Sequence, residues 1–131
     1  MFPKPDHRKA RRRRQRDAQL TERLAKAQAR LRDGYRSRWP GTAHIQRVEV
    51  AHLKAKGMGG SASANVVSNL ITLAASIHQG PRSLHSGHRR ILPLTSAGTS
   101  GPCAFFERDT LSDIWQLIGH EIEVGRLAAA L

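Results

Sequence analysis

The chain lacks several features that define common protein classes. Among its 131 residues there is one cysteine, Cys103, which excludes an internal disulfide framework and a zinc site built from several thiolates. No apolar run approaches the roughly 20 residues that span a bilayer, and the N-terminus lacks the apolar core of a signal peptide. Aromatic residues make up only 5% of the chain, so its core should be mainly aliphatic. We therefore expect a small cytoplasmic protein that does not associate with membranes.

Acidic residues are also scarce. Lys and Arg total 22 against 10 Asp and Glu, which gives a formal net charge of +12. Residues 1–40 carry a net charge of +10 and residues 41–131 a net charge of +2. Nucleic acids are the largest polyanions in a cell, so we expect a nucleic acid as partner, DNA first and RNA second. The alternatives are a basic surface that serves solubility or one that meets an anionic membrane.

Most of this charge lies in the first 16 residues. The segment KPDHRKARRRRQR, residues 4–16, is too polar to fold alone and predicts a disordered basic arm. Its central cations are candidates for contacts with phosphates: Arg11, Arg12, Arg13 and Arg14.

An amphipathic helix is predicted next, over residues 17–32, with Gly34 as its C-terminal cap. Its apolar residues recur at helical spacing: Leu20, Leu24, Ala27 and Leu31. Such a helix can dock on the core through this face and also lie along phosphates through a basic face. We assign residues 1–34 to the basic arm and helix.

Residues 35–131 predict a compact α+β domain. HIQRVEVAHL (44–53) predicts a strand, residues 53–69 a long glycine-containing loop, and LITLAASIH (70–78) a short helix or a strand-to-helix transition. RRILPLT and PCAFFER predict two further strands that form a hairpin.

A C-terminal helix is predicted to follow this hairpin. Thr110 would be its N-cap, with Asp113 three residues on as an approximate capping box. The apolar residues recur at the spacing of one helix face, which we expect to belong to the core: Leu111, Ile114, Trp115, Ile118 and Ile122.

Three polar residues stand at a fixed spacing in this domain. His52, Asn69 and His78 form the pattern H-x16-N-x8-H, with a histidine closing a strand, a G-G loop, and N-L-x-x-L before the second histidine. This pattern resembles the HNH endonucleases over roughly residues 35 to 90. The resemblance implies a ββα-metal core that holds one divalent ion and an HNH-like nuclease domain over residues 35–131.

The resemblance also implies a mechanism, hydrolysis of a phosphodiester by activated water. His52 would be the general base, since an imidazole titrates near neutral pH. Asn69 would either fix the His52 ring or tie the glycine loop to the strand, and His78 would bind the metal. The products would carry 5′-phosphate and 3′-hydroxyl ends, and sequence specificity would be low.

Many HNH proteins carry a structural zinc, and the chain differs from them at all four ligand positions. These positions hold Ser37, Thr42, Ala74 and Ile77, none of which binds zinc well. We therefore expect no structural zinc, with the C-terminal strands and helix supplying the stability that zinc would give.

The catalytic metal site also departs from the family pattern. The residue before the base is usually Asp or His, whereas here it is Ala51. Glu49 would lie on the same strand face, and His85 and His88 follow the second motif histidine, with His85 preferred as a second ligand. Two imidazoles would suit Zn, Ni or Mn, and a carboxylate with a phosphate would favour Mg or Mn.

The remaining candidates are cations near the motif that could bind phosphates, although loop cations are commonly just solvated: Lys54, Lys56, Arg82, Arg89 and Arg90. Trp39, Trp115 and Cys103 are predicted to pack in the interior. Two other functions stay open. One is a catalytically silent DNA-binding protein with the same fold, and the other is an RNA-binding protein that uses the arginine arm.

Overall fold

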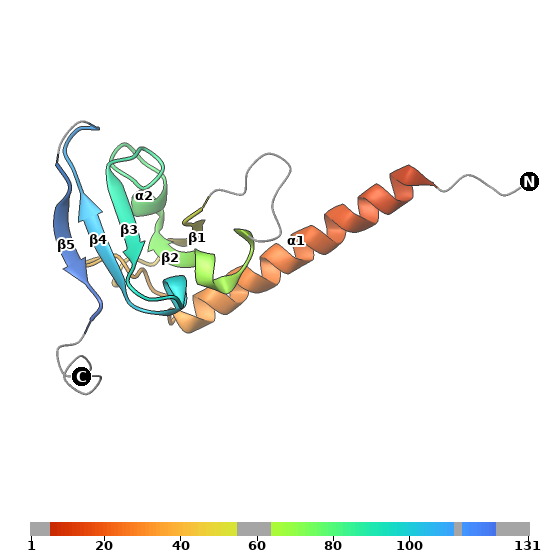
Figure 1. Ribbon diagram of the computed structural model, residues 1–131, viewed down its shortest axis with the longest axis horizontal. Helices are drawn as coiled ribbons and strands as arrows, with labels where there is room; N and C mark the ends of the chain where they lie inside the picture. The colour runs from red at the N-terminus through yellow and green to blue at the C-terminus, as the bar shows by residue number, and fades with distance from the viewer. Residues whose placement is uncertain (1–5, 55–63, 112–113, 123–131) are drawn as a thin grey trace, which may run out of the picture.

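The chain folds into one long helix and two small antiparallel sheets (Figure 1). The structure is a computed structural model and describes residues 6–54, 64–111 and 114–122. One sheet holds β1 (Val48–His52) and β2 (Leu70–Ala74), and the other holds β3 (Arg89–Pro93), β4 (Cys103–Glu107) and β5 (Gln116–His120). The helical elements are α1 (His7–Arg32), α2 (Ala75–His78), and the 3-10 turns η2 (Val67–Asn69) and η3 (Gly98–Ser100). The α+β class is thus confirmed, and β1, β2 and α2 follow one another along the chain.

Helix α1 begins at His7, well before the residue 17 expected from the sequence. The prediction of a disordered arm is therefore wrong for residues 7–16, while residues 1–5 lie outside the described part of the chain. Asp6 caps the helix, since its side chain accepts hydrogen bonds from the backbone N–H groups of Arg8 and Lys9 at 3.1 Å. Arg, Lys, Gln and Ala also rank among the better helix formers, which the disorder argument from polarity ignored.

The end of α1 agrees with the sequence. Gly34 follows the C-cap with φ +66°, a conformation that glycine adopts without strain. The N–H of Gly34 donates to the carbonyl of Leu31 at 3.1 Å, and that of Tyr35 donates to the carbonyl of Arg30 at 2.8 Å. This pair of bonds is a Schellman motif and satisfies two carbonyls that would otherwise lack partners.

The contact between α1 and the core does not use the predicted face. Leu20, Leu24 and Leu31 are 54%, 57% and 67% exposed, and Ala27 is exposed as well. The helix instead buries Ala25 and Ala29, in a cluster with Val50 and Leu70 of the first sheet. Alanine side chains let a helix backbone approach a sheet closely, an option that hydrophobic periodicity alone does not reveal.

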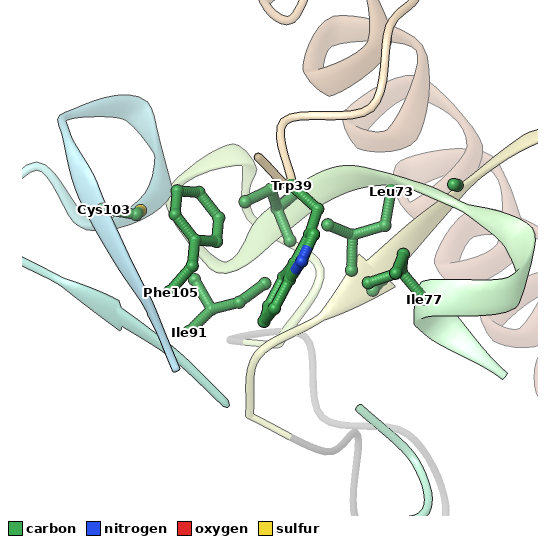
Figure 2. Packing of buried hydrophobic residues seen from close by; sticks show 9 residues of the cluster. Trp39, Leu73, Ile77, Ile91, Cys103 and Phe105 are labelled. Carbon is green, nitrogen blue, oxygen red and sulfur yellow. The ribbon is translucent and has the colours of Figure 1, made fainter. Parts of the chain in front are cut away.

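The main core lies between the two sheets and is centred on Trp39. Figure 2 shows its indole between Phe105 and Ile91 on one side and Leu73 and Ile77 on the other. The Trp39 and Phe105 rings meet edge to face, 5.3 Å between centroids. Cys103 is fully buried here, and burial raises the pKa of its thiol, so it behaves as the small apolar residue that was predicted.

Residues 116–120 form a strand where the sequence predicted a helix. β3 and β4 form the predicted hairpin, but β5 then pairs with β4, with Gly119 opposite Phe105. Glycine is a poor helix former, and a Cβ on Gly119 would lie 3.0 Å from Pro40 Cγ, so a side chain there would crowd the neighbouring turn. Ile114 and Ile118 are 89% and 40% exposed, so the predicted buried helix face does not exist. Asp113 lies outside the described residues.

A polar network joins α1 to both sheets. Asp33, whose side chain is 2% exposed, accepts from Arg32 Nε at 2.8 Å, from Arg38 Nη1 at 3.2 Å and from the backbone N–H of Thr72 at 3.0 Å. Arg38 also donates through Nε to Glu121 Oε2 at 2.9 Å, just beyond β5. Glu121 in turn accepts from the backbone N–H of Cys103 at 2.9 Å. One guanidinium therefore connects the helix end, β2, β4 and the end of β5.

Replacing Arg38 with Met should lower the free energy of unfolding by about 3 kcal/mol, because the nearly buried Asp33 and the half-buried Glu121 lose their shared cation. Urea unfolding followed by circular dichroism measures this change. Arg36→Met removes the same kind of side chain from an exposed position and should change the value by no more than about 0.5 kcal/mol. Equal stabilities for the two variants would show that the network does not hold the sheets together.

Candidate active site

The three motif residues lie where the elements of the first sheet end. His52 is the last residue of β1, Asn69 is the last residue of η2 immediately before β2, and His78 is the last residue of α2. The register pairs His52 with Leu70, so Asn69, which directly precedes Leu70, lies beside the end of β1. The structure thus brings His52 and Asn69 to the same end of the sheet, at the two borders of the long loop.

Asn69 closes the base of this loop. Its Oδ1 accepts from the backbone N–H of Lys54 at 2.9 Å, and its Nδ2 donates to the carbonyls of Lys54 at 3.1 Å and Ala64 at 2.9 Å. A backbone bond from Leu53 to the Asn69 carbonyl, 2.9 Å long, adds to this clasp. Of the two roles expected for Asn69, the contacts fit the one that ties the loop to the strand.

The ring of His52 is held by a different asparagine, Asn65, which the sequence reasoning missed. His52 Nε2 lies 2.8 Å from Asn65 Oδ1, and Asn65 is only 8% exposed. An amide oxygen only accepts, so Nε2 carries the proton and Nδ1 is the basic nitrogen of the neutral ring. The available signal was a second asparagine four residues before Asn69 in SASANVVSN.

A second polar group lies on the opposite face of β1. Alternation along the strand puts Glu49 with Ala51, which faces the core between the sheets, and His52 with Val50, which faces α1. Glu49 Oε1 accepts a hydrogen bond from His78 Nδ1 at 3.0 Å. The His85 ring packs edge-on against that of His78, with 4.7 Å between centroids. The structure therefore gathers Glu49, His78 and His85, three of the four residues expected to bind the metal.

The imidazole and carboxylate groups of these residues are suitable ligands for a divalent metal, although they are not arranged as a closed site. In the parts of the chain that the structure describes, no three His, Cys, Asp or Glu side chains converge closely enough to hold an ion. The carboxylate of Glu49 keeps the proton of His78 on Nδ1, which leaves Nε2 as the nitrogen with a ligating lone pair. Histidines that bind metals commonly donate their other N–H to a carboxylate in this way. Glu49 is thus placed to orient the His78 ring for metal binding, a role that suits it at least as well as binding the metal directly.

The remaining candidate residues are placed less centrally. His88 Nδ1 lies 2.8 Å from Ser86 Oγ, a contact within its own turn. Arg82 forms an exposed ion pair with Asp109 at 2.9 Å. Lys56 lies outside the described residues.

A cavity of about 730 Å³ opens between the base of the long loop and β3. Its lining includes Asn69 and three cations, Lys54, Arg89 and Arg90, and no acidic side chain among the described residues. The Arg89 guanidinium lies over the Trp39 ring, 5.0 Å from its centroid, and Arg89 Nη2 lies 3.8 Å from Glu107 Oε2. Burial lowers the pKa of Arg89. Arg90 and Lys54 are exposed, so this wall offers two exposed cations and one anchored cation to an anion.

The positions aligned with the family's zinc ligands also lie together. Ser37 Oγ and Thr42 Oγ1 are hydrogen-bonded at 2.7 Å, and Ser37 Oγ accepts from the backbone N–H of Ala74 at 2.8 Å. Ile77 packs with Ala74 and Trp39 in the main core. Hydrogen bonds and apolar contacts therefore join the turn at residues 37–42 to the start of α2.

No family model matches this chain, and neither a curated protein nor a solved structure matches it. The HNH resemblance therefore rests on the motif residues of the sequence alone. Within the described residues, none of the helices has the length and apolar character needed to cross a membrane.

We expect the protein to bind one divalent ion through His78. Calorimetric titration with Mn, Ni and Zn should show binding that His78→Ala abolishes and Glu49→Gln weakens tenfold or more. His44→Ala, which removes an exposed histidine from a turn, should bind like the parent. Equal affinities for His78→Ala and His44→Ala would exclude this site.

Proposed function

We propose that the protein is a metal-dependent endonuclease of the HNH type that hydrolyses phosphodiester bonds in DNA. The observation that carries this proposal is the placement of two amides around one histidine at the end of β1. Asn65 fixes the tautomer of the His52 ring, and Asn69 closes the loop beside it. The cationic cavity is lined by Leu53 and Lys54, the residues that directly follow His52.

The chemistry assigned to the chain begins with His52. Its Nδ1 would accept a proton from the attacking water, while the hydrogen bond to Asn65 keeps Nε2 protonated. Lys54, Arg89 and Arg90 would hold the phosphate in the cavity and balance its negative charge. Asn69 would keep both ends of the loop fixed during the reaction, because it binds the backbone of Lys54 and Ala64.

The metal-binding side of the site would come from Glu49, His78 and His85. A bound divalent ion supplies positive charge that stabilises the developing charge on the phosphate and the leaving oxygen. The His78 group and His52 lie on opposite faces of β1, but β1 ends at His52. Glu49 precedes His52 by three residues, about 10 Å along the strand, so a bound nucleic acid would have to pass around the end of β1 to meet both groups. The family likeness further implies products with 5′-phosphate and 3′-hydroxyl ends.

One observation favours a second candidate, a DNA-binding protein that does not cut. Ala51 has no ligand atom at the position where HNH enzymes usually carry a metal ligand, and the described residues hold no closed metal site. Under this alternative the cationic cavity and α1 bind nucleic acid, and His52 is dispensable.

Nicking of supercoiled plasmid tests the proposal. The purified protein should nick in the presence of Mg, Mn, Ni or Zn but not in a chelator, and His52→Ala should lower the rate at least about a hundredfold, since a general base typically contributes that much or more. DNA binding by the variant should stay near that of the parent, and His44→Ala should cut normally. A His52→Ala protein that cuts like the parent would refute the assignment. Salt-sensitive binding without cleavage in any metal would favour the second candidate.

The contact with Asn65 predicts a change in pH dependence. In Asn65→Asp a carboxylate faces His52 Nε2 and favours the protonated ring, so the acidic limb of the pH–rate profile should move to higher pH. Asn65→Ala removes the acceptor and should lower the rate about tenfold or more because the ring loses its fixed tautomer. Ser96→Ala, which changes an exposed residue outside the lining of the cavity, is the control and should leave the profile unchanged. A profile unmoved in Asn65→Asp would show that Asn65 does not act on the base.

A further inference from the structure

The N-terminal half of α1 is fully exposed among the residues that the structure describes. It extends away from both sheets (Figure 1), and every residue from Asp6 to Thr21 is exposed. At 1.5 Å per residue, the stretch from His7 to Thr21 is about 22 Å long. Seven cations and no acid lie between its residues 8 and 16: Arg8, Lys9, Arg11, Arg12, Arg13, Arg14 and Arg16.

These cations surround the helix instead of forming one basic stripe. Successive residues of an α-helix are turned by roughly 100°, so the four arginines Arg11–Arg14 point in four directions around the axis. Arg8, Lys9 and Arg16 add further directions. A helix that lies on the outside of a phosphate backbone uses only one side, and the cations on its far side then contact solvent alone.

Self-repulsion makes this arrangement unfavourable for the free helix. The pairs Arg8–Arg12, Lys9–Arg13 and Arg12–Arg16 place like charges four residues apart, on the same side of the helix. Asp6 at the N-cap offsets the positive end of the helix dipole, but the first turn itself carries no acidic residue to balance its cations. A partner with negative charge on several sides of the rod relieves all of these repulsions together.

We propose that residues 7–21 of α1 enter the major groove of duplex DNA. That groove is about 12 Å wide and has phosphates along both walls, and an α-helix with its side chains is about 10–12 Å across. The major groove of duplex RNA is deep and narrow and does not admit a helix in this way. The partner chemistry is therefore B-form duplex DNA.

The position of α1 on the core gives the groove contact a direction. Ala25 and Ala29 pack against Val50 and Leu70, on the face of β1 that also carries His52. The helix that makes the groove contact is thus anchored on the face of β1 that carries His52. The inference shares a nucleic-acid partner with the proposed function but does not depend on cleavage.

Two matched double variants test whether the cations act on all sides. Arg12→Gln with Arg16→Gln removes two cations from one side of the rod, and Arg11→Gln with Arg14→Gln removes two from nearly the opposite side, for the same loss of charge. Binding to a duplex of about two helical turns is measured by fluorescence anisotropy in a chelator over a range of salt concentrations. The plot of log affinity against log salt concentration falls for a cationic protein, and each double variant should make this slope shallower by about 2. A loss confined to one double variant would show one-sided binding and overturn the proposal.

A second measurement identifies the groove. Dimethyl sulfate methylates guanine N7 on the major-groove edge, so the protein should protect guanines in the bound duplex. Ala18→Pro keeps every charge but interrupts the rod and should lose this protection, whereas Ala18→Gln should retain it. Protection by Ala18→Pro equal to that of the parent would refute a role for the rigid helix, and so would the absence of protection by the parent.

A third measurement compares binding to duplex DNA and to duplex RNA. Duplex RNA of the same sequence should bind at least tenfold more weakly than duplex DNA at equal salt, and equal binding would overturn the proposal. None of these substitutions touches a buried residue, so circular dichroism should show folded cores throughout. Nicking is assayed separately with metal, so that failure of cleavage with intact N7 protection refutes the proposed function alone, and cleavage without protection refutes the groove contact alone.

Discussion

The fold depends on a buried ion network at the junction of its three parts. Asp33 is the C-cap of α1, accepts a hydrogen bond from the N–H of Thr72 in β2 and pairs with Arg38, which in turn pairs with Glu121 beyond β5. Charges removed from water are stabilising only when each finds its partners. The network is satisfied only when the helix end and the two sheets are in register, so it couples these three parts of the fold.

The candidate site uses the positions that this junction fixes. The first sheet packs against both α1 and the second sheet, which fixes the end of β1 and therefore the position of His52. Asn69, directly before β2, closes the adjoining loop. The basic cavity exists only because β3, with Arg89 and Arg90, packs across from that loop base. On the far side of β1, Glu49 reaches His78 because α2 turns back directly after β2. A hydrophobic core of aliphatic residues around Trp39 and Phe105 keeps both faces in place.

Local signals in the sequence predicted the elements that carry the motif. The β-branched run before His52, the strand-to-helix transition at residues 70–78 and the hairpin of β3 and β4 all follow from composition and turn residues, and each is present. The prediction failed where two patterns fit equally well. The spacing of apolar residues after Thr110 suits a helix, but β5 forms because the free edge of β4 offers a partner and Gly119 lets the strand pass Pro40 closely. Polarity likewise suggested disorder for residues 7–16, where the Asp6 cap and helix-forming side chains give a helix.

By itself the sequence determined which residue types are present and at what spacing: a cationic N-terminus, and His52, Asn69 and His78 in an HNH-like order. These follow from local chemistry, because caps, turns and strand patterns involve neighbours along the chain. The tertiary structure alone decided that Asn65 is the partner of the His52 ring, that Glu49 and His85 flank His78, and that alanines rather than leucines dock α1. Each of these is a contact between residues brought together by packing, and such contacts leave no periodic signal in the sequence.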